Sequence, residues 1–581
     1  MQDVKERLRV TRQPIESPRF SVKSPAVSSR SRKPRSFGLG SRFLGWCLAA
    51  LAALWMGSAQ AVTLNVPSTQ YPTIQSAVNA AQPGDLVLVA AGYYWDCYYN
   101  APGDTVKSVV VMKSGITLRG AGTGRTIVDP NLRGRGITCA GVTNATIRDL
   151  TVRRAAAAVH GAGIYCTAHS NPTIRNCEVI DCQSTGILCN HGSSPTIESC
   201  QINGNIAPGN GGGLLIDQSS PQVRSCVIQG DGSDGDGAGV WCWGDSSAPV
   251  FSGCDVSWNT VLNDLQDAGA GFWLGRGHPT ITDTVIEGDY AGWAGGGIYA
   301  QWCQLTLTNC RIVQNRTRDG LYTYGAGLLL LDSQGSTIQL CTVAHNLTYN
   351  DPEGSGGGIA LINSTGVIVR QCTIADNAAT YGGGVYVEST SGTLDHSIVA
   401  FSTCGQGIAC QNSPNFTSTC NDFYGNTGGN NFACQGNGTN NFTVDPQFCD
   451  PANDNFYLQP SSPCVNYGAC GMVGYPGVGC ATAVAQSILR ATPELWSAPN
   501  PFHTSTTIRF ALDRSQFGSL RVFDAAGRQV RLLEQGGLAA GPHQVIWDGR
   551  DGAGERVASG VYFFRLNLEG ARETRRVILV P

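Results

Sequence analysis

Four acidic side chains in the middle of the chain could perform acid–base chemistry: Asp264, Asp267, Asp319 and Glu353. They lie in the longest polar segments, where a binding site on a rigid scaffold is usually built. Two carboxyl groups at a suitable separation can cleave a glycosidic bond, one as the acid and the other as the base or nucleophile. The alternative is that they are ordinary solvated loop charges. These four residues are the candidate catalytic groups.

Five aromatic residues are candidates for carbohydrate binding. Trp241, Trp273 and Tyr299 occupy the same position in three successive sequence repeats, and Tyr322 and Tyr324 follow in the next polar segment. Large aromatic side chains that face water usually bind something that covers them. A sugar chain stacked on the ring faces would do so, and so would a neighbouring loop of the same chain.

The segment from Gly230 to Gly239, GDGSDGDGAG, is rich in aspartate and glycine. Hard cations prefer several carboxylate and carbonyl oxygens on such a turn, so Asp231, Asp234 and Asp236 are candidate ligands for Ca²⁺. The segment lacks the complete twelve-residue calcium loop. Asp231 and Asp289 also fall in a recurring turn position, which favours a structural role for both.

These residues are embedded in an imperfect repeat, whose units each contain Gly followed by an aliphatic or aromatic residue. The glycines are 23 to 32 residues apart, a period that indicates a stacked solenoid of short strands. In each strand the first and third residues after Gly should point inward and the second outward. The repeated glycines are Gly163, Gly186, Gly213, Gly239, Gly271, Gly297, Gly327, Gly358, Gly384 and Gly407.

Two further columns run through the repeat. Seven cysteines share a position between two apolar residues, and we expect them to be buried, stacked and free, because parallel inward side chains do not suit a disulfide. Five residues further on comes Asn or Asp, which we expect to form a ladder of turn side chains in the αL conformation. The cysteines are Cys177, Cys200, Cys226, Cys254, Cys310, Cys341 and Cys372; the ladder residues are Asn205, Asp231, Asn259, Asp289, Asn315, Asn346 and Asn377.

The whole pattern resembles the right-handed parallel β-helix of pectate-lyase-like proteins over residues 62–480. The resemblance implies a fold and not an activity. The WIDH and R-x-P-x-x-R signatures of pectate lyases are absent, as are the N-T-D, G-H-G and R-x-K signatures of polygalacturonases, and no lysine follows Lys113. The sequence therefore argues against the known catalytic types of this fold.

Residues 1–61 have the layout of a leader with a signal peptide. A basic segment precedes an apolar run, Phe43 to Met56, and the A-x-A sequence 59–61. The run is short for a membrane anchor, so we expect export, a mature chain that starts at Val62, and no transmembrane segment in it. Of the 39 basic and 42 acidic residues, 11 and 3 lie in the leader, which leaves a net charge of −11. That charge argues against nucleic acid as a partner.

The remaining boundaries follow from composition. We expect a cap at 62–130 with a short helix at 74–81, coils at 131–411 that begin near Gly136, a closing region at 412–480 and a linker at 481–497. Cys464, Cys470 and Cys480 should form disulfides that hold the closing region, a pairing that export permits.

Residues 498–581 form a separate unit with alternating apolar residues and Gly-containing turns, as in an antiparallel β-sandwich. The sequences APNPF, VFDAAGRQVR and GPHQVIWDGRDGAGERVASGVYFFRL resemble flagellar-hook-capping-like Ig domains and the sorting domains of type IX secretion. The resemblance implies attachment or export, with the secretion machinery as a partner.

The sequence thus predicts an all-β protein, a right-handed parallel β-helix solenoid followed by a small Ig-like sandwich. Its first functional hypothesis is a secreted or cell-surface protein that binds a polysaccharide or cell-surface glycan, as an envelope or adhesin-type component. The alternative is an extracellular polysaccharide lyase or glycoside hydrolase of a non-standard type.

Overall fold

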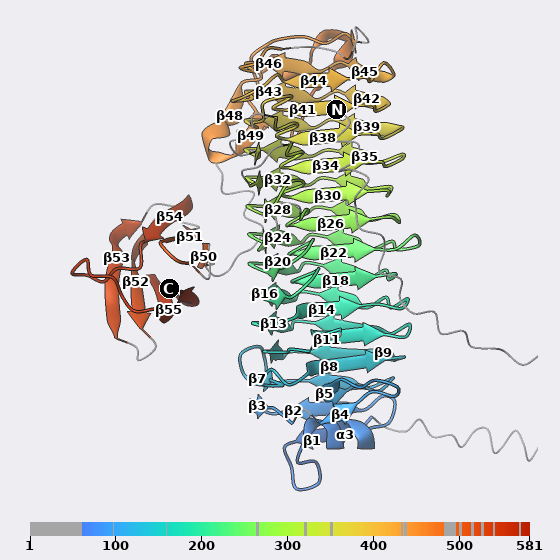
Figure 1. Cartoon of the computed structure of the whole chain (residues 1–581), viewed down its shortest axis with the longest axis vertical. Helices are drawn as coiled ribbons and strands as arrows, with labels where there is room; N and C mark the ends of the chain where they lie inside the picture. Colours follow the sequence, from blue (N-terminus) through green and yellow to red (C-terminus); the bar gives the residue numbers. More distant parts are fainter. Residues whose placement is uncertain are drawn as a thin grey trace, which may run out of the picture. The chain divides into compact units, whose positions relative to one another are not determined.

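The main body of the computed structural model is a stack of coils in which each turn of the chain adds one strand to each of three long sheets (Figure 1). The structure describes residues 61–96, 98–157, 160–262, 267–318, 322–348, 353–430, 434, 438–480, 495–498, 502–512, 516–524, 528–538, 541–568 and 571–580. Neighbouring strands in the stack are parallel, apart from the antiparallel pair β4–β5. The predicted all-β solenoid is confirmed.

The long sheets are named A, B and C here, and D is a shorter fourth sheet. Sheet A contains β1 (Thr63–Val66), β2 (Leu86–Val89), β6 (Thr117–Arg119), β9 (Thr143–Arg148), β12 (Asn171–Arg175), β15 (Thr196–Glu198), β19 (Gln222–Arg224), β23 (Val250–Ser252), β27 (Thr280–Thr282), β31 (Thr306–Thr308), β35 (Thr337–Gln339), β39 (Val367–Arg370), β42 (Gly392–Asp395), β45 (Phe416–Thr419) and β47 (Gly438–Thr439). Sheet B contains β3 (Gly92–Tyr94), β7 (Thr126–Val128), β10 (Thr151–Arg153), β13 (Glu178–Ile180), β16 (Gln201–Asn203), β20 (Val227–Gln229), β24 (Asp255–Ser257), β28 (Val285–Glu287), β32 (Arg311–Val313), β36 (Thr342–Ala344), β40 (Thr373–Ala375), β43 (Ile398–Ala400) and β46 (Asp422–Tyr424).

Sheet C carries the glycine-led strands. It contains β4 (Tyr99–Asn100), β5 (Lys107–Val111), β8 (Arg135–Ala140), β11 (Ala162–Thr167), β14 (Thr185–Cys189), β18 (Leu214–Asp217), β22 (Val240–Trp243), β26 (Phe272–Gly275), β30 (Ile298–Gln301), β34 (Leu328–Leu331), β38 (Ile359–Ile362), β41 (Val385–Glu388) and β44 (Ile408–Gln411). Sheet D contains β17 (Ile206–Ala207), β21 (Gly232–Ser233), β25 (Thr260–Val261), β29 (Tyr290–Ala291), β33 (Arg316–Thr317) and β37 (Leu347–Thr348), and it accounts for the longer repeats.

The core fills the space that the sheets enclose. Inward residues such as Val240, Cys242, Ile298 and Ile338 are 0–1% exposed and belong to one continuous apolar cluster. Such short strands cannot bury a core alone, so stability comes from stacking each coil on the next. The predicted alternation of inward and outward residues in the glycine-led strands is confirmed.

The Asn and Asp column forms the predicted ladder inside the coil. Asn315 donates from its side chain to Asn346, and Asn346 donates to Asn377, both at 3.0 Å. One detail of the prediction was wrong. The αL conformation belongs to the preceding residue, for example Gln314 with φ 58°, because the turn must aim the next side chain inward. The ladder residues are 0–1% exposed.

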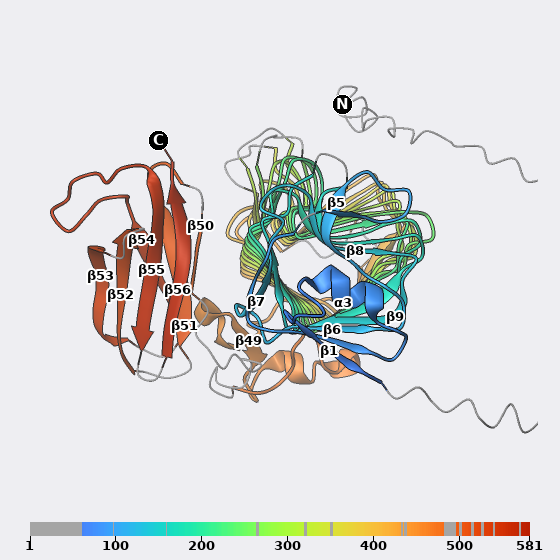
Figure 2. The same cartoon turned by 90° about the horizontal axis from the view of Figure 1, so that it is seen from below.

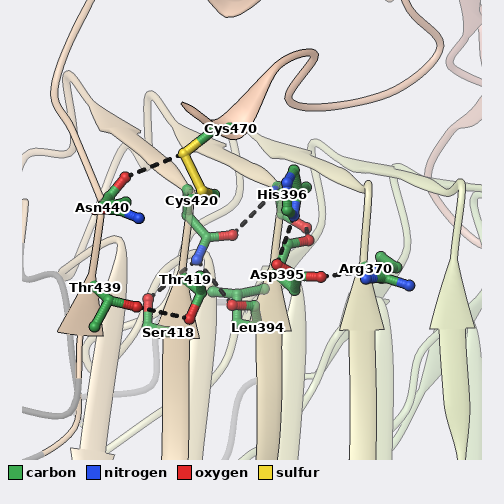
Figure 3. A network of polar contacts seen from close by, with 12 residues as sticks. Arg370, Leu394, Asp395, His396, Ser418, Thr419, Cys420, Thr439, Asn440 and Cys470 are labelled. Carbon is green, nitrogen blue, oxygen red and sulfur yellow. Dashed lines mark hydrogen bonds and ion pairs between the residues drawn. A yellow bond between two sulfur atoms is a disulfide. The ribbon is translucent and has the colours of Figure 1, made fainter. Parts of the chain in front are cut away.

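The seven column cysteines are buried and free, as predicted. Their thiols donate instead to backbone carbonyls, for example Cys310 to Thr308 at 3.3 Å. Among the described residues, the disulfides pair Cys410 of the last coils with Cys434, and within the closing region Cys420 with Cys470 and Cys449 with Cys480. Figure 3 shows the second of them at the edge of sheet A.

The expected disulfide of Cys464 was wrong. Its thiol is buried and donates to the carboxylate of Asp422 at 3.4 Å, so it fills a polar niche inside the closing region. Burial raises the pKa of Asp422 to about 7.

The first end of the coil is closed by α3 (Ile74–Ala80), which lies across the space between the sheets (Figure 2). Thr73 and Ser76 form a capping box, and Ile74, Ala77 and Val78 are buried, so the expected cap helix is confirmed. The coils begin earlier than Gly136, since β1 and β2 already pair in parallel. Short strands without the glycine motif carry the first turns.

The closing region returns along the outer face of sheet B. It contains β48 (Phe448–Asp450), η1 (Pro451–Asn453), β49 (Asn455–Leu458), η2 (Pro463–Val465) and η3 (Gly468–Cys470). Phe448, Phe456 and Leu458 pack in one cluster with Val313 and Ala344 of the coils. Asp454 forms ion pairs with Arg311 at 2.7 Å and His345 at 2.9 Å, which tie the segment to coils more than a hundred residues earlier. Burial lowers the pKa of His345, but the hydrogen bond and the charge of Asp454 together outweigh burial, so the pKa of His345 is raised.

The C-terminal unit is the expected antiparallel sandwich. One sheet contains β50 (Trp496–Ala498), β51 (Thr506–Leu512) and β54 (Gly541–Trp547), and the other β52 (Gln516–Asp524), β53 (Gln529–Leu538), β55 (Gly560–Leu568) and β56 (Ala571–Leu579). It has its own apolar core around Trp547, Phe564 and Ile508. Among the described residues, no helix has the length and apolar character needed to cross a membrane.

Candidate functional site

The candidate site lies on the outer face of sheet C, where β18, β22, β26 and β30 are neighbours. Register places Trp241, Trp273 and Tyr299 opposite one another on three successive strands. A second outward position on the same strands carries Asp217, Trp243, Gly275 and Gln301. These two columns and the turn after them form the surface that is called the aromatic face here.

The rings of the first column stack on each other. Centroids of Trp241 and Trp273 are 5.4 Å apart at an interplanar angle of 12°, and those of Trp273 and Tyr299 are 5.8 Å apart at 14°. Trp273 therefore has both ring faces covered within the protein, one by Trp241 and the other by Tyr299. The binding roles of the three residues stay predictions. The packing itself stabilises the coil stack.

Tyr299 was expected to face water, but only 2% of it is exposed. The loop after sheet D covers it, with Trp293 edge-on at 5.9 Å, and the Tyr299 hydroxyl donates to Gln301 at 3.0 Å. Tyr324 is also buried, at 8% exposure, against Trp293. Tyr322, by contrast, is 40% exposed.

The open part of the aromatic face lies around Trp243 and Trp302. Trp302 is 43% exposed and meets Trp243 edge-on at 6.3 Å. The Arg276 guanidinium lies 4.8 Å from the centre of the Trp243 ring and also pairs with Asp245 at 2.8 Å. A Cβ at Gly275 would lie 2.5 Å from both the Trp243 and Trp273 rings, so only glycine lets the two indoles close over the strand.

A titratable cluster adjoins this open part. Asp217 is in register with Trp243 and interacts electrostatically with His191 and His160. Burial raises the pKa of Asp217 above its usual range, although both histidines oppose the shift. His191 contacts the Thr167 hydroxyl through Nδ1 at 3.1 Å. A carboxyl group with a raised pKa holds its proton to a higher pH than an ordinary aspartate, as a general acid must.

His160 is held in place by the neighbouring coil. Its ring stacks on Tyr165 at 5.9 Å, and its carbonyl accepts a hydrogen bond from Arg135 Nε at 2.8 Å. Arg135 is 1% exposed, lies 4.1 Å from the centre of the Tyr165 ring and pairs with Asp104. Burial, and then the charge of Arg135, lower the pKa of His160. The imidazole is therefore neutral at physiological pH.

Two of the four acidic residues expected from sequence, Asp267 and Glu353, lie within the described part of the chain. Asp264 and Asp319 lie outside the described residues. The backbone carbonyl of Asp267 accepts hydrogen bonds from Gly292 and Trp293, so this residue anchors the loop that covers Tyr299. Glu353 lies in the turn before Ser355, whose hydroxyl donates to its carbonyl. Their roles as acid and base stay predictions.

The aspartate-rich turn does not bring its three carboxylates together as a cation site. Asp231 is 1% exposed and belongs to the inner ladder, where it accepts from Asn205, whereas Asp234 is exposed and Asp236 accepts from the Ala268 amide. Within the described ranges, no group of three His, Cys, Asp or Glu residues could hold a metal ion. The Ca²⁺ prediction on Asp231 is corrected by the inward turn that buries it.

Sequence reasoning missed the cluster of Asp217, His191 and His160. The three residues come from different coils and share no local motif. The repeat could have placed Asp217 beside Trp243, because both stand four residues after their repeat glycines, Gly213 and Gly239.

Two family models match the chain. The model described as "Right handed beta helix region" matches residues 100–261 and 238–446, and "FlgD Ig-like domain" matches residues 502–571. A comparison with curated proteins finds no match.

Solved structures give weaker likenesses. The A-module of mannuronan C-5 epimerase AlgE4 from Azotobacter vinelandii is 17% identical, with 64% of this chain and 90% of that chain covered and a TM-score of 0.35. The pectate lyase Pel9A is 16% identical, with 70% and 90% covered and a TM-score of 0.33. Dimeric latent PorU from Porphyromonas gingivalis is 21% identical, with a TM-score of 0.14; the match covers 15% of this chain and only 9% of PorU. At these scores the activities in the names remain statements about those proteins.

Proposed function

We propose that this chain, which belongs to the right-handed β-helix family, binds a polysaccharide along the outer face of sheet C. The observation that carries the proposal is the exposed Trp302 beside the half-buried Trp243, on a face that also presents the partly exposed side chains of Arg276 and Asp217. Sugars offer apolar C–H faces and many hydroxyls, which suit aromatic rings next to charged groups.

The coil geometry supports a linear ligand. Successive strands are about 4.8 Å apart, so equivalent side chains repeat along the stack at that interval. An extended chain lying along sheet C would meet Asp217, then Trp243 and then Trp302 in order. The stacked inner rings of Trp241, Trp273 and Tyr299 would hold this surface rigid, which limits the entropy lost on binding.

Trp302→Ala should weaken polysaccharide binding about tenfold or more, because exposed indoles at the centre of an interface commonly contribute over 1 kcal/mol. The melting temperature should change little, since the side chain is 43% exposed. Affinity electrophoresis against a panel of neutral and acidic polysaccharides measures the effect.

Two control variants separate a loss of binding at the site from a general effect of removing a tryptophan. Trp95→Ala removes a 57% exposed indole far along the coil stack and should leave affinity unchanged. Trp273→Ala should lower the melting temperature, because it removes the middle ring of the stack. Equal affinity of the parent and Trp302→Ala for every bound polysaccharide would refute the proposal.

Cleavage of the bound chain is the second candidate function, favoured by the raised pKa of Asp217 beside His191. In this case the protonated Asp217 would act as the general acid and a histidine as its partner base. Asp217→Asn should then abolish release of reducing ends while leaving binding within about threefold of the parent. Product release that persists in Asp217→Asn, or is undetectable in the parent, would remove this role.

Export and surface attachment complete the proposal. They are supported by the leader sequence of residues 1–61 and by the match of residues 502–571 to an Ig-like family model. The secretion machinery would recognise the C-terminal domain. N-terminal sequencing of the exported protein tests this: a start at Val62 supports it, and a retained Arg35 contradicts it.

A further inference from the structure

Three Thr-aliphatic-Arg tripeptides repeat in successive coils on the outer face of sheet A. They end in Arg119, Arg148 and Arg175 and stand on the adjacent strands β6, β9 and β12. Register pairs Arg119 with Arg148 and Arg148 with Arg175, so the three guanidinium groups form one column. This column is called the arginine ladder. Thr117, Thr146 and Thr173 form a parallel column of hydroxyls beside it.

The ladder is poorly compensated within the fold. Arg119 and Arg148 share one carboxylate, that of Asp149, at 3.3 and 3.5 Å, and Arg175 meets Glu198 only at 3.7 Å. The three arginine side chains are 44%, 35% and 53% exposed. Like charges on directly neighbouring strands destabilise a sheet, so folding gives no reason for this alignment.

A cleft runs beside the ladder, along the turns that follow its strands. It has a volume of about 620 Å³ and is lined by Arg119, the turn at 120–123, Asp149, Asn176 and Ser199. Asn176 and Ser199 are αL turn residues of the following coils, which present their side chains at the corner between sheets A and B. The cleft therefore joins one arginine to polar groups from successive coils.

We propose that the arginine ladder and this cleft bind an anionic polysaccharide through its carboxylate or sulfate groups. Guanidinium groups bind both in a bidentate manner, and a column with strand spacing suits charges that repeat along a linear chain. The threonine column supplies hydroxyls for the sugar ring. Single-stranded nucleic acid is disfavoured, because its binding relies on stacking aromatic groups, and the residues in register at the two ends of the ladder are Leu88 and Glu198.

This site is separate from the aromatic face, which lies on sheet C, and does not depend on the function proposed there. The triple variant Arg119→Gln/Arg148→Gln/Arg175→Gln tests it. At low salt, its affinity for polygalacturonate or dextran sulfate should fall at least about tenfold, because charge-assisted bonds are lost. Binding to neutral polysaccharides should be unchanged. The two polyanions decide whether carboxylate or sulfate is preferred.

Arg370→Gln is the matched control. Arg370 occupies the same column of sheet A and is 55% exposed, but its guanidinium pairs with Asp395 at 2.8 Å, as Figure 3 shows. Its removal should leave polyanion affinity unchanged, and the melting temperatures of both variants should match the parent.

Four outcomes would overturn the inference: a parent that binds neither polyanion, a triple variant that binds as the parent does, an equal loss in Arg370→Gln, or tighter binding of single-stranded DNA than of either polysaccharide. If Trp302→Ala lost binding to neutral polysaccharides and the triple arginine variant did not, that result would test the aromatic face and not the arginine ladder.

Discussion

Ile338→Asp should unfold the coiled region while the C-terminal sandwich stays folded. Ile338 is 0% exposed on β35, in register with Leu307 and Val369 of the neighbouring coils. An ionised carboxylate at this place would have no partner, and such burial costs several kcal/mol. Because each coil is stabilised by its neighbours, a break in the middle of the stack exposes apolar surface on both sides.

The adjacent coil offers a matched control. Ile368, one strand along on β39, is 42% exposed, so Ile368→Asp should leave the melting temperature nearly unchanged. Circular dichroism and limited proteolysis measure both variants. For Ile338→Asp we expect a resistant fragment that starts within residues 481–497, since the sandwich has its own core around Trp547. Simultaneous loss of both regions would show one cooperative unit instead.

The repeat predicted most of the fold because one physical rule recurs in every coil. A residue that follows the glycine must point inward, as Ile298 and Leu328 do, whatever the rest of the coil contains. The cap helix was predictable for the same reason, since its buried residues have helical spacing. The closing region was less predictable from the sequence, because its path over sheet B depends on contacts such as that of Asp454 with Arg311, 143 residues apart.

The candidate site was harder to predict, because exposure and proximity depend on more than one coil. The position of Tyr299 is outward, but its burial is decided by Trp293 in a loop from sheet D. Asp217 gains its environment from His191 and His160 of preceding coils. Periodicity gives the direction of a side chain and not what covers it.

Asp231→Asn and Asp289→Asn should each stabilise the protein at neutral pH. Both aspartates are at most 1% exposed, and each accepts two hydrogen bonds through Oδ1, Asp231 from the backbone and side-chain amides of Asn205 at 2.7 and 2.9 Å. Among the described residues, the Oδ2 atoms of both are buried without a hydrogen-bond partner. An asparagine in the ladder instead donates from this position, as Asn315 does to the Ile286 carbonyl at 3.0 Å.

The same geometry fixes the pH dependence. Burial raises the pKa of both carboxyl groups well above the usual range. Below the unfolded value of about 3.9 both states are protonated, and the stabilisation is fully present. As pH rises, the unfolded chain ionises first, so the parent loses stability until the folded pKa is passed. The asparagine variants do not titrate and escape this loss.

We therefore expect Asp231→Asn to match the parent near pH 4 and to exceed its stability by about 1–3 kcal/mol at pH 7, the usual cost of an unsatisfied buried polar group. Melting temperatures measured between pH 4 and pH 8 give the difference directly. Asn315→Asp is the converse control: it places a carboxylate in the same ladder and should make stability fall more steeply as pH rises. A constant difference between Asp231→Asn and the parent at every pH would mean that folding does not raise the pKa of this carboxyl group, because only a proton held more tightly by the folded state produces the slope.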